Sequence, residues 1–413
     1  MKNVTDEMGA PSRIVFDEVE DMLRRHFQER IQCLLDEELT ELLGREKYER
    51  LSEEHGTRAH RNGHGKPRKF TMSCGTVTVR RPRARGLDER FESKLLPFFV
   101  KRTQKVNELL PQLYLHGLAE GDMDKALRGL LGDDAPISAP TVARLKLKWH
   151  GEFEAWSKRD LSDLEVVYLW VDGVYVKAGL EKDKAAVLVA VAGLSDGTKT
   201  IVAMEAGYRE SSESWSALLR SMKKRGMNTP RLVIGDGHLG IWRGLSEVYP
   251  GVDEQRCWLH KMRNVMDKLP KRSQKEGGEL AKKIQHANSE KEAVELRDTF
   301  QTWCRANGFA KAEETIEDDW DRMVTFMRYP RQHWQHLRTT NPVESPFNAV
   351  RIRTGAARRY KRVDNATAVI WKTLQVAEQS FRRLSAPHLM KSVFNGTEYE
   401  DGVEKPKAKV SAA

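Results

Sequence analysis

The sequence predicts an α/β fold: a mixed β-sheet with helices packed on it, preceded by a mainly helical region that includes a small basic β module. Three observations support this prediction. Residues 161–260 alternate between strongly β-forming segments and amphipathic helical patterns. Residues 1–160 and 261–335 have mainly helical periodicity. The chain has 413 residues, of which 39% are hydrophobic and 31% charged, as expected for a globular protein of two or three domains.

The N-terminal region, residues 1–100, is expected to bind a polyanion. Apolar side chains recur at helical spacing until Gly44. The segment FTMSCGTVTVRRPR then alternates like a β-hairpin around Gly75. Between Thr57 and Arg85 there are nine Lys or Arg residues and no acid, in a chain of net charge +10. A solvated face is the alternative, but a second basic block near the C-terminus favours contact with nucleic acid, here through Arg80, Arg81 and Arg83.

Residues 101–160 contain three shorter helical patterns, which predict a helix-turn-helix. The third pattern begins at Ser138, where Pro140 and Thr141 are typical of a helix start. A helix, a short turn and a second helix form the arrangement that places a recognition helix in the major groove of DNA. A plain helical bundle is the alternative. The residues expected on or beside the recognition helix are Arg144, Lys146 and Lys148.

The region 161–260 predicts three strands, then a helix, a strand, a helix and a strand. The segments EVVYLWVDGVYVKAG and AAVLVAVAGL are strongly β-forming. The amphipathic segment SESWSALLRSMKKRG begins at a capping Ser and stops at a Gly, which indicates a helix. Residues 336–390 close with the helical pattern NATAVIWKTLQVAEQSFRRL. We expect residues 391–413 to be a disordered tail, because its final segment has few apolar side chains.

Two aspartates belong to apolar strands of the same predicted sheet. Asp172 lies inside LWVDGVYV, and Asp236 ends RLVIGD. A single Asp of this kind is most often an ordinary loop residue, but a buried carboxylate is costly, so two of them suggest that both point at one spot. Glu344 is the third candidate, since Pro342 fits the first turn of its helix. Three carboxylates are ligands that Mg²⁺ prefers, and two such ions can stabilise an in-line displacement at phosphorus.

A Cys-x-x-His pair follows the second aspartate. Cys257 and His260 make up half of a zinc signature, and the sequence has no second pair to complete four ligands. A purely structural pair is therefore one interpretation. His238, two residues after Asp236, is expected to support the site by orienting the backbone rather than by binding metal.

The order of VDGVYVK, VIGDGHLGIW, QRCWLHKMRNVMDKLP and HWQHLRTTNPVESPFNAVRIRT resembles the Mutator-type transposases of bacterial insertion sequences, which are DDE enzymes with a ribonuclease-H-like core. The resemblance covers most of the chain, and its most specific parts are RCWLH and RTTNPVES. It implies that residues 261–335 are a helical insertion in the core, and that Cys257 supports a site in which His260 lies near the scissile phosphate. The implied metal ligands are Asp172, Asp236 and Glu344. These three are also implied to be catalytic, together with His260 as a hydrogen-bond donor or proton carrier.

Two departures from the pattern of this family stand out. The chain has GDGH where the family more often has Ser-Asp-Ala-His, and Pro346 follows Glu344 closely. We expect Pro346 to alter how the Glu344 helix begins. The arginines after this helix are expected to clamp phosphates beside the site; they are Arg351, Arg353, Arg358 and Arg359.

The resemblance implies an enzyme that cuts at the terminal inverted repeats of its own element and transfers the freed 3′ end to a second strand. It also implies a copy-out, paste-in route through a circular intermediate. The expected cofactor is Mg²⁺, with two ions and with Mn²⁺ able to substitute. The expected partners are double-stranded DNA of the repeats and of the target, and other copies of the chain in a homodimer or higher oligomer that brings two ends together.

Three other classes of function compete with this one. A non-catalytic DNA-binding relative, such as a domesticated copy or a self-repressor, would have lost an acidic ligand, and all three are present. A metal-dependent nuclease of the same fold would cut without strand transfer. A serine or tyrosine recombinase would form a covalent adduct that survives EDTA.

The sequence favours the bacterial cytoplasm, with the protein on the nucleoid when it binds DNA. The N-terminus lacks a signal-peptide pattern, and the longest apolar runs are too short to span a bilayer, so no membrane partner is expected. The four cysteines are widely scattered, which suits a reducing compartment.

Overall fold

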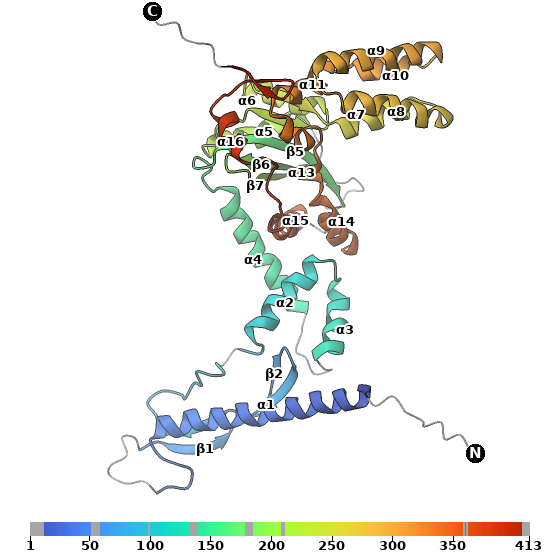
Figure 1. Ribbon diagram of the computed structural model, residues 1–413. Coiled ribbons are helices and arrows are strands. Elements are labelled where there is room, and N and C mark those ends of the chain that lie inside the picture. Colours follow the sequence, from blue (N-terminus) through green and yellow to red (C-terminus); the bar gives the residue numbers. More distant parts are fainter. Residues whose placement is uncertain are drawn as a thin grey trace, which may run out of the picture. The chain divides into compact units, whose positions relative to one another are not determined.

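The structure is a computed structural model that describes residues 12–50, 58–97, 100–131, 139–177, 185–207, 211–357, 360 and 362–406. The chain forms two compact units, whose elements are labelled in Figure 1. The first unit comprises Met1–Tyr114 and Leu118–Leu145, and the second comprises Leu115–Gly117 and Lys146–Ala413. The predicted regions 1–100 and 101–160 are therefore not separate units, because most of both lies in the first unit. The boundary with the second unit falls after residue 145, where the sequence predicted residue 160.

The first unit combines a long helix with two small antiparallel strand pairs. α1 (Ser12–Leu43) ends one residue before Gly44, as predicted, and the expected hairpin consists of β2 (Arg68–Met72) and β3 (Gly75–Val79). Gly75 has φ +121°, a backbone conformation that glycine adopts without strain. Leu35 of α1 packs on Val77, Val79 and Leu96. The second strand pair is formed by β1 (His60–His64) and β4 (Pro82–Arg85).

Three helices follow, in the order that the sequence predicts. They are α2 (Gln104–Leu115), α3 (Glu120–Leu131) and α4 (Ala139–Ser157). The connection between α3 and α4, including Ser138, lies outside the described residues. The helices of the predicted helix-turn-helix are therefore present, while its turn and its function stay predictions.

The second unit contains a five-stranded mixed sheet of order β7-β6-β5-β8-β9. β5 (Val166–Val176), β6 (Ala185–Leu194) and β7 (Lys199–Gly207) are antiparallel neighbours. β8 (Leu232–Gly235) runs parallel to β5, and β9 (Asp253–Arg256) runs parallel to β8. With α5 (Ser212–Lys224) and α6 (Leu239–Val248) between them, the predicted order of strands and helices is confirmed.

Both faces of this sheet are covered, which explains why β5 reads as an almost unbroken apolar run. Leu169 and Val171 belong to a core that includes Trp215 of α5 and Trp242 of α6. Alternate residues of a strand point to opposite faces, and Tyr168 accordingly meets His333, with 2.8 Å between its hydroxyl and Nδ1. Two helices near the C-terminus also pack on the sheet: α15 (Val363–Glu378) contacts β7, and α16 (His388–Phe394) contacts β5.

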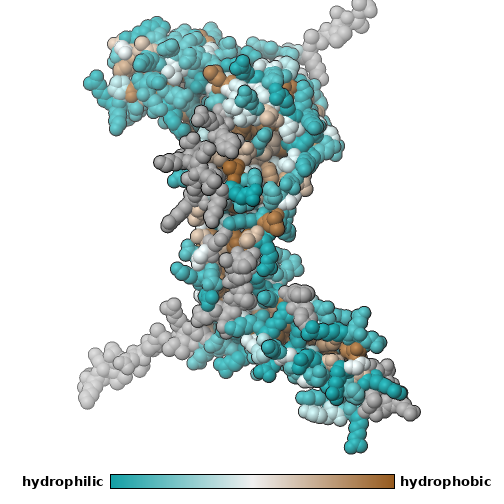
Figure 2. Space-filling view, turned by 180° about the vertical axis from the view of Figure 1, so that it is seen from behind, coloured by the Kyte–Doolittle hydropathy of each residue, from teal (hydrophilic) through white to brown (hydrophobic). Residues whose placement is uncertain are grey.

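The region 261–335 is helical, as predicted, and lies in the chain between β9 and the segment that carries Glu344. The elements of this region and their neighbours are α7 (Trp258–Asp267), η1 (Lys271–Ser273), α8 (Gln274–Gln285), α9 (Glu290–Ala306), α10 (Ala310–Glu317), α11 (Trp320–Val324), η2 (Thr325–Arg328), η3 (Arg331–His333) and α12 (Trp334–Leu337), followed by α13 (Asn341–Glu344) and α14 (Phe347–Ala356). Figure 2 shows a mainly hydrophilic surface over α8 and α9.

The C-terminal segment corrects one expectation. We predicted a disordered tail over residues 391–413, but its described part, up to residue 406, contains the end of α16 and a hairpin of β10 (Tyr399–Glu400) and β11 (Val403–Glu404). The prediction was wrong there because Val393 and Tyr399 are buried and anchor the segment. Residues 407–413 lie outside the described residues. Among the helices of the described chain, none is long and apolar enough to cross a membrane.

Candidate active site

Two aspartates lie side by side on neighbouring parallel strands, Asp172 inside β5 and Asp236 directly after the end of β8. β5 and β8 pair with Trp170 opposite Ile234, and Asp172 and Asp236 each follow two residues later. Parallel strands carry equivalent positions to the same edge of a sheet. Asp172 is 8% exposed, and its Oδ1 accepts a hydrogen bond of 2.8 Å from the backbone N–H of Gly173.

The turn after β8 fixes the Asp236 carboxylate. Its Oδ1 accepts a hydrogen bond of 2.9 Å from the backbone N–H of His238. Gly237 between them has φ +101°, which a side chain would strain. The His238 ring caps α6, because its Nδ1 accepts a 3.2 Å hydrogen bond from the N–H of Gly240. The geometry thus gives His238 a local supporting position, with its backbone on Asp236 and its ring on α6.

Glu344 reaches the same place from the short helix α13, which packs on β5 and β6. Its Oε1 accepts a hydrogen bond from the hydroxyl of Thr340, one turn earlier. The helix begins normally, with Pro342 in its first turn. The expectation that Pro346 disturbs this start was wrong: Pro346 stands at the N-cap of α14, so the interruption comes after Glu344.

The Cys-x-x-His pair lies beside Glu344. The Cys257 sulfur accepts a hydrogen bond of 3.3 Å from the backbone N–H of Thr340. It also lies 3.3 Å from the hydroxyl oxygen of Thr340, whose one proton is donated to Glu344. His260 Nδ1 lies 3.9 Å from Oε1 of Glu344. One ligand atom from each of Cys257, His260 and Glu344 lies within 4.8 Å of the others, so these three could hold a metal ion. A thiolate and an imidazole favour a softer ion such as Zn²⁺, whereas carboxylates favour Mg²⁺.

The pKa values show that these groups act on one another. Burial and the charges of Asp236 and Glu344 together raise the pKa of Asp172 to about 7, against the opposing effects of the Gly173 hydrogen bond and His260. Interaction with Cys257 raises the pKa of His260 to about 9 against the effect of burial, and Glu344 and Asp172 act in the same direction. Three carboxylates that repel one another fit a divalent cation, because the cation would offset the repulsion.

Comparison with known proteins identifies the family of the chain. Residues 2–382 match the family model described as transposase, Mutator family. The chain belongs to the Mutator family of transposases. It is 42% identical, over 303 residues, to the transposase for insertion sequence element IS6120 of Mycolicibacterium smegmatis, covering 73% of this chain and 94% of that protein. It is 34% identical over 283 residues to the transposase for IST2 of Acidithiobacillus ferrooxidans, covering 68% and 95%. With the transposase for IS406 of Burkholderia multivorans the identity is 28% over 374 residues, covering 90% of each.

The predicted DNA contacts of this Mutator-family chain differ in exposure. Arg80 and Arg83 are exposed, whereas Arg81 is half-buried and donates to the carbonyl of Pro97. On α4, Arg144 and Lys148 are exposed and Lys146 is half-buried.

The arginines after Glu344 also differ in the exposure of their side chains. Arg351 is exposed, but Arg353 is 1% exposed. α14 turns the Arg353 side chain into the protein interior, so in this structure it is not available to a phosphate, and its predicted contact stays a prediction. Arg358 and Arg359 lie outside the described residues.

Two residues beside the site were not predicted from the sequence. Thr340 is fully buried and joins Cys257 to Glu344. Its position immediately before α13, within RTTNPVES, was an available signal. Arg256, which lies against Gly237, gave none, because its partner Asp319 is 63 residues away in the chain.

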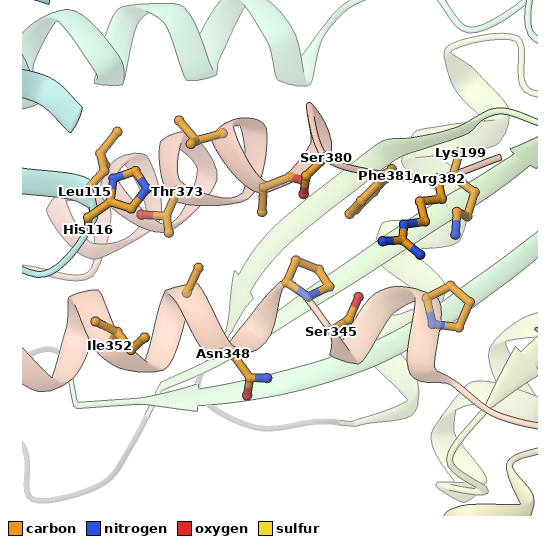
Figure 3. A pocket seen from close by; sticks show the side chains of 15 residues that line it. Leu115, His116, Lys199, Ser345, Asn348, Ile352, Thr373, Ser380, Phe381 and Arg382 are labelled. Atoms are coloured by element: carbon orange, nitrogen blue, oxygen red, sulfur yellow. The ribbon is translucent and has the colours of Figure 1, made fainter. Parts of the chain in front are cut away.

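A cavity of about 650 Å³ lies between α14 and α15, close to the helix that carries Glu344 (Figure 3). Ser345 and Asn348 line it from one side, and Thr373 and Ser380 from the other. Asp172, Asp236 and Glu344 are not among its lining residues, so the carboxylate site and this cavity are distinct.

Proposed function

We propose that this Mutator-family chain is the transposase of an insertion sequence, and that it cuts DNA at the terminal inverted repeats and joins the freed 3′ end to a second strand. The observation that carries the proposal is the convergence of Asp172, Asp236 and Glu344 beside the C-terminal end of β8. The order of strands in the mixed sheet supports a ribonuclease-H-like core.

In this proposal the three carboxylates hold Mg²⁺, with two ions expected and Mn²⁺ able to substitute. Such ions supply Lewis-acid stabilisation at phosphorus and activate the attacking oxygen. The chain contributes orientation, because each carboxylate accepts a hydrogen bond from a neighbouring group: the N–H of Gly173, the N–H of His238 and the hydroxyl of Thr340. Hydrogen bonds of this kind hold metal ligands in the geometry that the ion requires.

His260 would act as a hydrogen-bond donor and proton carrier beside the scissile phosphate. Its pKa of about 9 keeps the imidazole positively charged at neutral pH. A positive donor is suited to a phosphate oxygen or to a departing 3′ oxygen. Cys257 would support this residue, and its sulfur accepts a hydrogen bond from the backbone N–H of Thr340.

The first unit and α4 would bind the inverted repeats, and Arg351 would contact phosphate near the carboxylates. Exposed Arg80, Arg83, Arg144 and Lys148 can reach DNA as the chain stands. The two repeats and the target strand have to be held together, so we infer a homodimer or higher oligomer on DNA in the bacterial cytoplasm.

The test incubates purified protein with duplex DNA that carries the element's own end, with Mg²⁺ or with EDTA. The wild type should cleave and join strands in Mg²⁺ only. Asp236→Ala should bind the same DNA and leave it uncut, because the phosphate contacts lie elsewhere. Cleavage at the wild-type rate by Asp236→Ala would overturn the assignment.

The same experiment separates the competing functions. Binding without cleavage by the wild type would favour a non-catalytic relative or self-repressor. Cleavage without joined products would favour a nuclease of the same fold. A covalent protein–DNA adduct that persists in EDTA would favour a serine or tyrosine recombinase.

A further inference from the structure

Arg256 is the last residue of β9 and stands opposite Gly235, the last residue of β8. Its side chain lies against the turn that follows β8. A Cβ atom built on Gly237 would meet Nε of Arg256 and would lie 2.8 Å from Cζ and 2.9 Å from Cδ. The guanidinium therefore fills the space beside Gly237, the residue directly after Asp236.

Asp319 holds this guanidinium in place. Oδ2 of Asp319 lies 2.6 Å from Nη1 of Arg256, and the two side chains are only 19% and 12% exposed. Asp319 itself has φ +58°, a left-handed conformation that is uncommon for any residue but glycine, and it stands at the N-cap of α11. The backbone is thus bent at the point where this carboxylate is presented to Arg256.

A second ion pair ties the same aspartate back to β9. Oδ1 of Asp319 accepts from Nη1 of Arg322 at 2.7 Å, and Nε of Arg322 donates to Oε2 of Glu254 at 2.5 Å. Glu254 and Arg256 are alternate residues of β9. Asp319, at the start of α11, and Arg322, inside α11, therefore contact β9 at Arg256 and Glu254. Of these two β9 residues, Arg256 lies against Gly237 in the Asp236 turn.

We propose that Arg256 is a positioning residue for Asp236, and that through Asp319 the inserted helices set the place of this carboxylate. Asp236 Oδ1 is bound by the N–H of His238, so the carboxylate moves with the turn. Nε of Arg256 has no hydrogen-bond partner among the described residues, so its contact with the turn is one of shape and charge. The effect on metal binding rests on the proposed function; the effect on the turn does not.

Two measurements on the full-length protein test the proposal. Hydrogen exchange reports the turn directly, because the N–H groups of His238 and Gly240 are bonded within it. The Mg²⁺ concentration that half-saturates thermal stabilisation reports the metal site. Arg256→Gln and Asp319→Asn should speed exchange in residues 236–240 and raise that Mg²⁺ concentration about tenfold, as is typical when a group behind a metal ligand is lost.

Arg322→Gln is the control, since it removes the ion pairs of Arg322 with Asp319 and Glu254 and keeps the Arg256–Asp319 ion pair beside Gly237. It should lower the melting temperature and leave exchange in residues 236–240 unchanged. Arg256→Lys keeps the charge without the planar shape. Its melting temperature should equal that of the wild type, while exchange in residues 236–240 should stay as fast as in Arg256→Gln. Fast exchange in a stably folded variant would show that the effect of Arg256→Gln is not a folding defect.

Equal exchange in Arg256→Gln and the wild type, or equal acceleration by Arg322→Gln, would overturn the proposal and leave Arg256 a purely structural residue. A wild type that Mg²⁺ does not stabilise would count against the metal site instead. In that case faster exchange in Arg256→Gln would still support the positioning of Asp236.

Discussion

The backbone N–H of Thr340 donates a hydrogen bond to the sulfur of Cys257, 3.3 Å away and 83 residues earlier in the chain. The hydroxyl of the same threonine donates to Glu344. One buried residue therefore connects the start of α7, through its backbone, with the end of α13, through its side chain.

Thr340→Val removes the hydroxyl and keeps the shape, so we expect lower stability and slower DNA cleavage. The loss of a buried hydrogen bond costs about 1–2 kcal/mol of unfolding free energy, measured by urea denaturation. Thr373→Val is the control, since Thr373 is 2% exposed and its hydroxyl donates to the carbonyl of Val369 at 2.8 Å, within α15. Both variants should lose stability, and only Thr340→Val should lose cleavage; equal cleavage would contradict a role for Thr340 at the site.

Mg²⁺ binding should strengthen as the pH rises through 7. The pKa of Asp172 is about 7 in the metal-free protein, and the ion requires the ionised carboxylate. The apparent affinity should therefore be about tenfold lower at pH 6 than at pH 8, measured by titrating Mg²⁺ against melting temperature. Asp172→Asn should show weak binding with little pH dependence, and a wild-type affinity independent of pH would count against Asp172 as a ligand.

The stability of the metal-free protein should change in the opposite direction. The folded pKa of Asp172 lies above its ordinary value of 3.8, so the folded state binds this proton more tightly than the unfolded state. The contribution of Asp172 is greatest below about pH 4 and falls as the pH rises toward 7. The comparison of wild type with Asp172→Asn by denaturation across this range isolates it, and a difference that stays constant with pH would refute the assignment.

Two histidines near the carboxylates should respond differently to the same substitution. His260→Asn removes the charged donor beside Glu344, and we expect cleavage to fall about 100-fold with DNA binding retained. His238→Asn should remain active, because Asn is also a good N-cap for α6. Single-turnover cleavage measures both, and comparable losses would indicate that the site tolerates no change in either position.

Arg83 and Arg353 provide a contrast between an exposed and a buried arginine. Arg83→Gln should weaken binding to DNA and reduce the slope of log affinity against log salt by about one. Arg353→Gln should instead lower the melting temperature, since the side chain is part of the interior. Fluorescence anisotropy at several salt concentrations and thermal melts distinguish the two; an unchanged slope for Arg83→Gln would remove it from the DNA interface.

Much of the core could be predicted from local pattern. The apolar runs of β5 and β8 and the caps of α5 depend on residues close in the chain, and the same runs marked Asp172 and Asp236 as exceptional. The tail was misjudged because the composition of its last residues was extended over Val393 and Tyr399, which anchor the segment by packing on distant parts of the chain.

By itself the sequence determined which segments form strands and helices and which carboxylates interrupt apolar strands, because those properties follow from neighbouring residues. Only the tertiary structure decided which face of each helix is buried. On α14 the apolar Ile352 is 60% exposed and the charged Arg353 is 1% exposed, the reverse of what hydropathy suggests. The packing of a helix against its neighbours sets its rotation about its axis, and those neighbours, like the partners that join Arg256 to Asp319 and Thr340 to Cys257, come from remote parts of the chain.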